Sequence, residues 1–128
     1  MSVYHQKMIF RIDLRNNPKA LFVFGDNLDR RGLGGQAKAM RGEPNAVGIP
    51  TKISPSHAEN AHFTDEDFDK ALLPIDEAFD RLTEHVKSGG IIIWPADGIG
   101  TGLAGLPQRA PKIHNYILVR LSKLESVQ

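Results

Sequence analysis

Two glycine-rich segments of the chain have the residue types of loops that bind phosphate. The first contains Gly32, Gly34, Gly35 and Gln36, and the second contains Gly98, Ile99, Gly100, Thr101, Gly102 and Leu103. Glycine tolerates positive φ and has no side chain over its own N–H, so successive N–H groups can surround an anion. We expect these residues to bind two phosphates or one diphosphate. The alternative is that the glycines only form tight turns, since there is no GxxxxGKS/T pattern and no GxGxxG pattern within a proper βαβ unit.

Three polar residues stand next to these segments. Asn27 follows the apolar run 20–25, Lys52 follows the segment 45–50, and Asp97 directly precedes Gly98. An amide or a carboxylate can position water, and a lysine can act as an electrostatic group or a nucleophile. Asp97, at the end of a predicted strand, is therefore a candidate catalytic residue. The histidines have no metal-ligand spacing, and the sequence predicts neither a metal nor another cofactor.

The elements that must position these residues alternate between strands and helices. Apolar runs predict strands at 20–25, 45–50 and 91–95, and alternating residues predict another at 8–14. Helices are expected at 36–41, after Thr64 up to Gly89, and from Pro107 or Ala110 to Leu124. Thr64 and Asp67 have the spacing of a capping box at the start of the second helix. The buried face of that helix is predicted by one apolar stripe, Phe68, Leu72, Ile75, Phe79, Leu82 and Val86. Pro74 should kink or split the second of these helices. The alternation predicts an α/β domain with a mainly parallel, mixed sheet and helices on both faces. In such sheets ligands bind beyond the carboxyl ends of the strands, so both loops should share one edge.

Composition narrows the class of protein. A chain of 128 residues suits a single domain spanning 1–128. The absence of cysteine excludes a disulfide framework, a thiolate zinc site and a cysteine nucleophile. With 16 basic and 15 acidic side chains there is no global field for general nucleic-acid binding. The longest apolar run is far shorter than a membrane span. We expect a cytoplasmic protein without a membrane partner.

The order of these features resembles the macrodomain, a module that binds ADP-ribose. The segments that carry the resemblance are Arg11-Ile12-Asp13-Leu14, Phe24-Gly25-Asp26-Asn27, the first glycine loop, and 95–102 with the second. The branch most similar is that of the terminal ADP-ribose glycohydrolases, in which a lysine follows the middle strand, as Lys52 does here. The resemblance implies a shortened three-layer α/β/α domain. By this resemblance Asp13 would accept a hydrogen bond from adenine, Asn27 would face the distal ribose, and the loops would hold the diphosphate. The resemblance also makes Asn27 and Lys52 candidate catalytic residues beside Asp97.

The resemblance implies a ligand but leaves the activity open. The partner is an ADP-ribose-like nucleotide or an ADP-ribosylated macromolecule, and hydrolysis would cleave a glycosidic bond at the distal ribose. Ala104 stands where the glycohydrolase branch has its catalytic aspartate, which favours the alternative of a non-catalytic binding module. A third possibility is a nucleoside-monophosphate phosphoribohydrolase, suggested by Gly100-Thr101. That family's glutamate is missing, because no acidic residue lies between Thr101 and Ile113.

Overall fold

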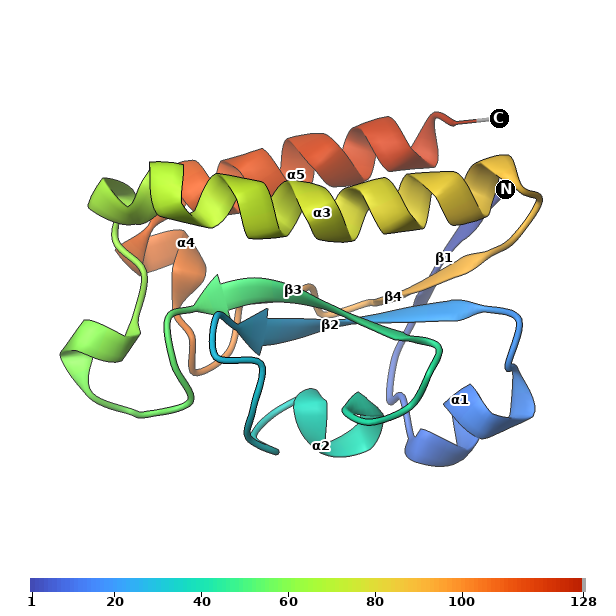
Figure 1. Cartoon of the computed structure of the whole chain (residues 1–128), viewed down its shortest axis with the longest axis horizontal. Helices are drawn as coiled ribbons and strands as arrows, with labels where there is room; N and C mark the ends of the chain where they lie inside the picture. Colours follow the sequence, from blue (N-terminus) through green and yellow to red (C-terminus); the bar gives the residue numbers. More distant parts are fainter. Residues whose placement is uncertain (128) are drawn as a thin grey trace.

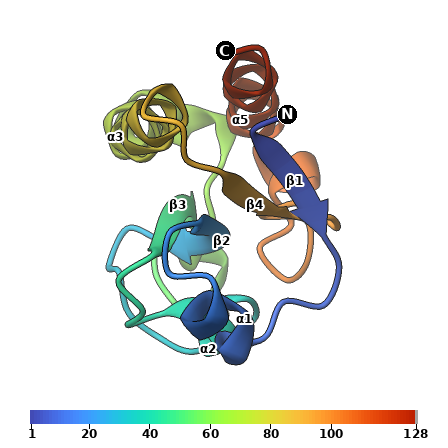
Figure 2. The same ribbon diagram turned by 90° about the vertical axis from the view of Figure 1, so that its right-hand side faces the viewer.

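A four-stranded sheet lies at the centre of the computed structural model, which describes residues 1–127 (Figures 1 and 2). Helices α3 and α5 cover one face of the sheet, and α1 and α2 cover the other. In chain order the elements are β1 (Val3–Gln6), α1 (Arg11–Asn16), β2 (Leu21–Asn27), α2 (Ala37–Met40), β3 (Ala46–Lys52), α3 (Phe68–Lys87), β4 (Ile92–Pro95), α4 (Leu106–Arg109) and α5 (Pro111–Glu125). This confirms the predicted three-layer α/β/α class.

All four described strands run parallel, in the order β1-β4-β2-β3, so the sheet is not mixed as expected. Because the strands are parallel, their carboxyl ends meet at one edge. The loop that follows β2 and the loop that follows β4 both leave this edge, which confirms that the two glycine-rich loops lie together. Strand β2 also has its successor β3 on one side and β4 on the other. This is the topological switch point at which ligands bind in open α/β sheets.

The strands β2 and β4 separate before they end. Their pairing is confined to Leu21 with Ile92 and Phe22 with Ile93, whereas β2 stays paired with β3 as far as Asn27. A register irregularity between Asp26 and Asn27 sets Asn27 opposite Lys52. The sheet therefore opens into a crevice between the second half of β2 and the end of β4.

Two apolar layers hold the helices to the sheet. On the α3 and α5 side the stripe Ile75, Phe79, Leu82 and Val86 is buried, as the sequence predicted, and Phe79 stacks on Trp94 with ring centroids 6.0 Å apart. The opposite layer joins the α1 and α2 residues Leu14, Ala37 and Met40 to Phe22, Phe24 and Ile93 of the sheet. Within residues 1–127, no helix is both long enough and apolar enough to cross a membrane.

The prediction of a strand at 8–14 was wrong. The segment turns at Met8, whose φ is 51°, and then forms α1 from Arg11. The Asp13 carboxylate accepts the Phe10 N–H at 2.8 Å, which closes the first turn of a helix. Of the alternating residues, Met8, Phe10 and Ile12 are exposed and Leu14 is buried.

The true first strand, β1, lies earlier in the chain and was missed. It is a short edge strand in which only Val3 is fully buried, so it has almost no apolar pattern.

The predicted helices are present, although their ends differ from those expected from the sequence. Helix α3 continues through Pro74 as one helix, and it is preceded by a 3-10 turn over Asp65–Asp67. Thr64 and Asp67 form the capping box that the sequence indicated, with the Thr64 N–H donating to Asp67 at 2.8 Å. The last helix is divided at Ala110 into α4 and α5, because the backbone leaves the helical conformation there before Pro111.

Candidate functional site

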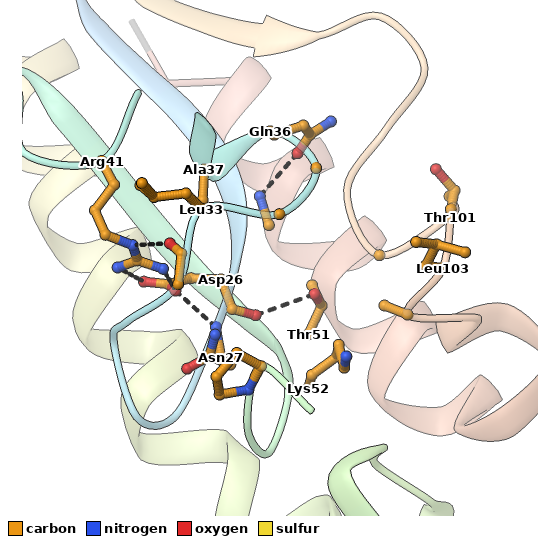
Figure 3. A pocket seen from close by; sticks show the side chains of 18 of the residues that line it. Asp26, Asn27, Leu33, Gln36, Ala37, Arg41, Thr51, Lys52, Thr101 and Leu103 are labelled. Atoms are coloured by element: carbon orange, nitrogen blue, oxygen red, sulfur yellow. Dashed lines mark hydrogen bonds and ion pairs between the residues drawn. The ribbon is translucent and has the colours of Figure 1, made fainter. Parts of the chain in front are cut away.

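A cavity of about 400 Å³ occupies the crevice where β2 and β3 end (Figure 3). Leu33 and Gln36 of the first loop face Thr101 and Leu103 of the second, with Thr51 and Lys52 between them. The sequence-predicted residues that line it are Asn27, Gly32, Gly34, Gly35, Gln36, Lys52, Gly98, Gly100, Thr101, Gly102 and Leu103. The structure thus brings together eleven of the fourteen candidate residues.

The other three candidates lie outside this cavity. The Asp13 carboxylate accepts the Phe10 N–H and, at 3.2 Å, the side-chain amide of Gln6, so it caps α1. Ile99 is only 3% exposed and packs into the core. Asp97 is exposed and lines a neighbouring cavity instead. Asp97 is therefore not beside Asn27 and Lys52, with which the sequence had grouped it.

Both glycine-rich loops present N–H groups that no part of residues 1–127 uses. None of the N–H groups of Gly32, Leu33, Gly34 and Gly35 donates a hydrogen bond, and the same holds for 100–103. No other atom lies within 4 Å of the space that a side chain would fill at Gly34, Gly35 or Gly102. The backbone at these positions is uncovered, which is the arrangement that binds anions.

A buried ion pair holds the first loop in shape. The Asp26 carboxylate is buried and paired with the guanidinium of Arg41, and Arg30 also contacts it at 3.2 Å. The Arg41 Nε–H donates to the Gly32 carbonyl at 2.7 Å, and its guanidinium lies 5.5 Å from the centre of the Phe24 ring. Arg41 therefore connects the loop to β2. A Cβ at Gly48 on β3 would collide with this carboxylate, so only glycine fits there.

Sequence reasoning missed this pair. Arg30 and Arg41 lie beside the first glycine loop, and the anion that these two contact is Asp26. No local pattern indicated the contact, because Asp26 lies in β2, Arg30 has a φ of 56°, and Arg41 is 15 residues from Asp26.

Asn27 has a buried acceptor without a partner. Its side-chain Nδ2–H donates to the Arg31 carbonyl at 2.9 Å, whereas its Oδ1 is buried and accepts nothing within the described residues. Asn27 is 7% exposed and lines the cavity. An unpaired buried acceptor costs about 1–3 kcal/mol. This oxygen is suited to accept a hydrogen bond from an O–H or N–H group of a ligand.

Lys52 lies next to Asn27 and supplies positive charge. Its Nζ donates to the Ser56 carbonyl at 2.7 Å. Burial, and then the charge of Arg109, lower the pKa of Lys52 below its usual value. Arg109 is itself held by two hydrogen bonds to Glu59, at 2.8 and 3.2 Å.

The cavity is cationic overall. Arg31 and Lys52 line it, and the only carboxylate among its lining residues is Asp26, which already has arginine partners. Ala104 lines it without adding an acid. Nowhere in 1–127 do three His, Cys, Asp or Glu side chains gather closely enough to hold a metal ion. The cavity therefore favours an anion and offers it N–H donors and a lysine.

A second cavity, of about 670 Å³, lies on the other side of the first loop. It is lined by Met8, Phe10 and Met40, together with the exposed carboxylate of Asp97. Met8 and Phe10 are both more than half exposed. The two cavities share Gly35 and Gln36, so they adjoin along the first loop.

Comparisons with known proteins place the chain in a family whose function is unknown. No curated protein and no solved structure matches this chain. A family of unknown function, DUF7831, matches residues 4–120. This range includes both glycine-rich loops and every strand that lines the cavity. The chain therefore belongs to the DUF7831 family.

Proposed function

We propose that this protein binds ADP-ribose or a closely related nucleotide diphosphate. The observation that carries the proposal is one cavity that combines free N–H groups from two loops with the unpartnered Oδ1 of Asn27. Hydrogen bonds to a charged group contribute about 1.5–3 kcal/mol each. Two loops that face each other can hold both phosphates of a diphosphate. Asn27 then accepts from a hydroxyl of the attached ribose.

The second cavity gives the base a place to bind. A nucleotide diphosphate has a flat, largely apolar base at the far end from the distal ribose. Phe10 and Met8 offer exposed aromatic and apolar surface beside the shared residues Gly35 and Gln36. A ligand whose diphosphate crosses the first loop can therefore occupy both cavities. The resemblance to macrodomains is in keeping with this ligand. Asp13 caps α1, so the sequence-based role of Asp13 in adenine binding is not part of the proposal.

Binding without rapid hydrolysis fits the chemistry of the cavity better than fast turnover does. General acid–base catalysis is typically worth about 10²–10⁴-fold and needs a free proton acceptor or donor beside the reacting bond. The one carboxylate among the lining residues is the ion-paired Asp26. A second candidate, slow de-ADP-ribosylation, is favoured by Lys52, because its lowered pKa makes the neutral amine more accessible.

Calorimetric titration tests the proposal. ADP-ribose should bind more tightly than AMP, and inorganic pyrophosphate should compete with it. When an ADP-ribosylated protein is incubated with the wild type, the half-life of its modification should be much longer than the residence time of the complex. If ADP-ribose produces no heat at millimolar concentration, the proposed function is wrong. Release of ribose 5-phosphate from AMP would instead support a phosphoribohydrolase.

A further inference from the structure

The side chain of Gln36 connects the two sides of the crevice. Its Oε1 accepts the N–H of Gly25 on β2 at 2.8 Å, and its Nε2–H donates to the carbonyl of Gly98 in the second loop at 2.9 Å. Gln36 itself begins α2, so one side chain joins the first loop, β2 and the second loop. Its acceptor and one of its donors are occupied within the protein. These two bonds connect the loops, and one Nε2–H has no partner within the described residues.

The separation of β2 and β4 explains why a side chain is needed there. Leu21 donates to Ile91 on the β4 side and Phe22 donates to Asn45 on the β3 side, so N–H groups alternate along β2. Gly25, four residues after Leu21, therefore points its N–H toward β4, where pairing has already ended. An unpaired buried N–H is costly. Gln36 supplies the missing acceptor through its Oε1, and its Nε2–H donates to the carbonyl of Gly98.

Gln36 also stands between the two cavities, since it lines both. A ligand that occupies both cavities must cross the first loop at Gly35 and Gln36. The distance between the free N–H groups of the two loops decides whether one phosphate or two can contact both loops. We propose that Gln36 is a positioning residue that sets this distance, and that it thereby makes the site select a diphosphate diester over a monophosphate. This inference rests on the proposed function.

The first test removes both hydrogen bonds and keeps the volume. In Gln36→Met, affinity for ADP-ribose should fall about tenfold or more, because the two hydrogen bonds of Gln36 no longer hold the loops together. Affinity for AMP, which needs only one phosphate subsite, should change by less than about threefold. The ratio of the two affinities is the readout, since a partly unfolded variant loses both equally. Gln108→Met, at an exposed position of α4 outside both cavities, is the matched control.

The second test restores one hydrogen bond with pH. In Gln36→Glu the carboxylate can accept from Gly25 but has no proton for the Gly98 carbonyl. A protonated carboxyl can donate to it. The affinity of this variant for ADP-ribose should approach that of the wild type as the pH falls from about 8 to about 5, because burial raises the pKa of a carboxyl group. The diphosphate diester does not titrate in this range. The wild type and Gln108→Glu, measured alongside, should show parallel curves.

The outcomes separate the two ideas. If the wild type does not bind ADP-ribose, the proposed function fails. If the wild type binds and Gln36→Met keeps the ratio of ADP-ribose to AMP affinity, the positioning role is overturned. A pH profile of Gln36→Glu that is parallel to that of the wild type overturns it too. The second test decides the matter if Gln36→Met does not fold.

Discussion

Replacing Asn27 with leucine should weaken ligand binding without lowering the free energy of unfolding by much. The change removes the hydrogen bond from Nδ2 to the Arg31 carbonyl, worth about 0.5–1.5 kcal/mol. It also removes the buried Oδ1 that has no partner, which costs the folded protein about 1–3 kcal/mol. The Arg31 carbonyl keeps a partner, because Arg41 donates to it at 3.2 Å. The free energy of unfolding, measured with urea, should therefore stay within about 1 kcal/mol of the wild type or rise.

Ligand binding should suffer in the same variant. A ribose hydroxyl that faces leucine is left buried and unpaired, at a cost of about 1–3 kcal/mol, which is about 5- to 150-fold in affinity. Calorimetry should show this loss for ADP-ribose and none for pyrophosphate, which has no ribose to place at Asn27. Asn115→Leu, at an exposed position of α5, is the control.

Three results would refute the reasoning about Asn27. A loss of stability above about 2 kcal/mol would mean that Oδ1 is bonded in the free protein. Equal losses for ADP-ribose and pyrophosphate would mean that the substitution deforms the loop. Unchanged affinity for ADP-ribose would remove ribose from this position.

Three further predictions concern stability and ionisation. Gly48→Ala should lower the free energy of unfolding by about 1–3 kcal/mol, because the added methyl group collides with the buried carboxylate of Asp26. Gly34→Ala, where no atom is close, should lower the free energy of unfolding little. Equal effects of the two substitutions would contradict this reasoning. Hydrogen bonds from Arg11 and then Arg15 lower the pKa of Glu43 from 4.5. The ionised Glu43 therefore stabilises the folded protein above about pH 4.5, and this stabilisation is lost as the pH falls through the lower folded-state pKa. The difference in thermal stability between the wild type and Glu43→Gln should accordingly vanish in acid, and a constant difference would exclude the mechanism. Because the pKa of Lys52 is lowered, Lys52 should react with an acylating reagent at a lower pH in the folded chain than in the urea-unfolded chain. Pyrophosphate should protect Lys52 in the folded chain. Mass spectrometry of peptides measures the extent of acylation in each case.

The elements with strong apolar patterns could be predicted from the sequence. The run at 20–25 is the buried β2, and the stripe from Ile75 to Val86 is the buried face of α3, because burial on two faces or one face leaves a clear signature. The shared edge of the glycine loops also followed, since parallel strands place their carboxyl ends together. Local chemistry succeeded where the partners were close in sequence, as in the capping box of Thr64 and Asp67.

Contacts between distant residues could not be read from local patterns. Asp13 was placed on a strand because 8–14 alternates, but the hydrogen bond from its carboxylate to Phe10 forms a helix start instead. The two hydrogen-bond partners of the Gln36 side chain are 11 and 62 residues away, so its connection of the two loops could not be read from the sequence. Asp97 directly precedes the second glycine loop in sequence, yet it lines the second cavity, with Met8 and Phe10, rather than the first.

The crevice itself has a simple origin in three residues. Pro95 ends β4 and has no N–H to continue a ladder toward β2, so pairing between these strands stops early. Gly25 then lies beside the gap, and a side chain there would come within 3.3–3.5 Å of Thr51, the Gly100 N–H and Gln36. Glycine allows the second loop to approach β2 this closely, and Gln36 satisfies the N–H that pairing left free. A larger residue at position 25 should therefore push the two loops apart, with the same loss of diphosphate selectivity as Gln36→Met.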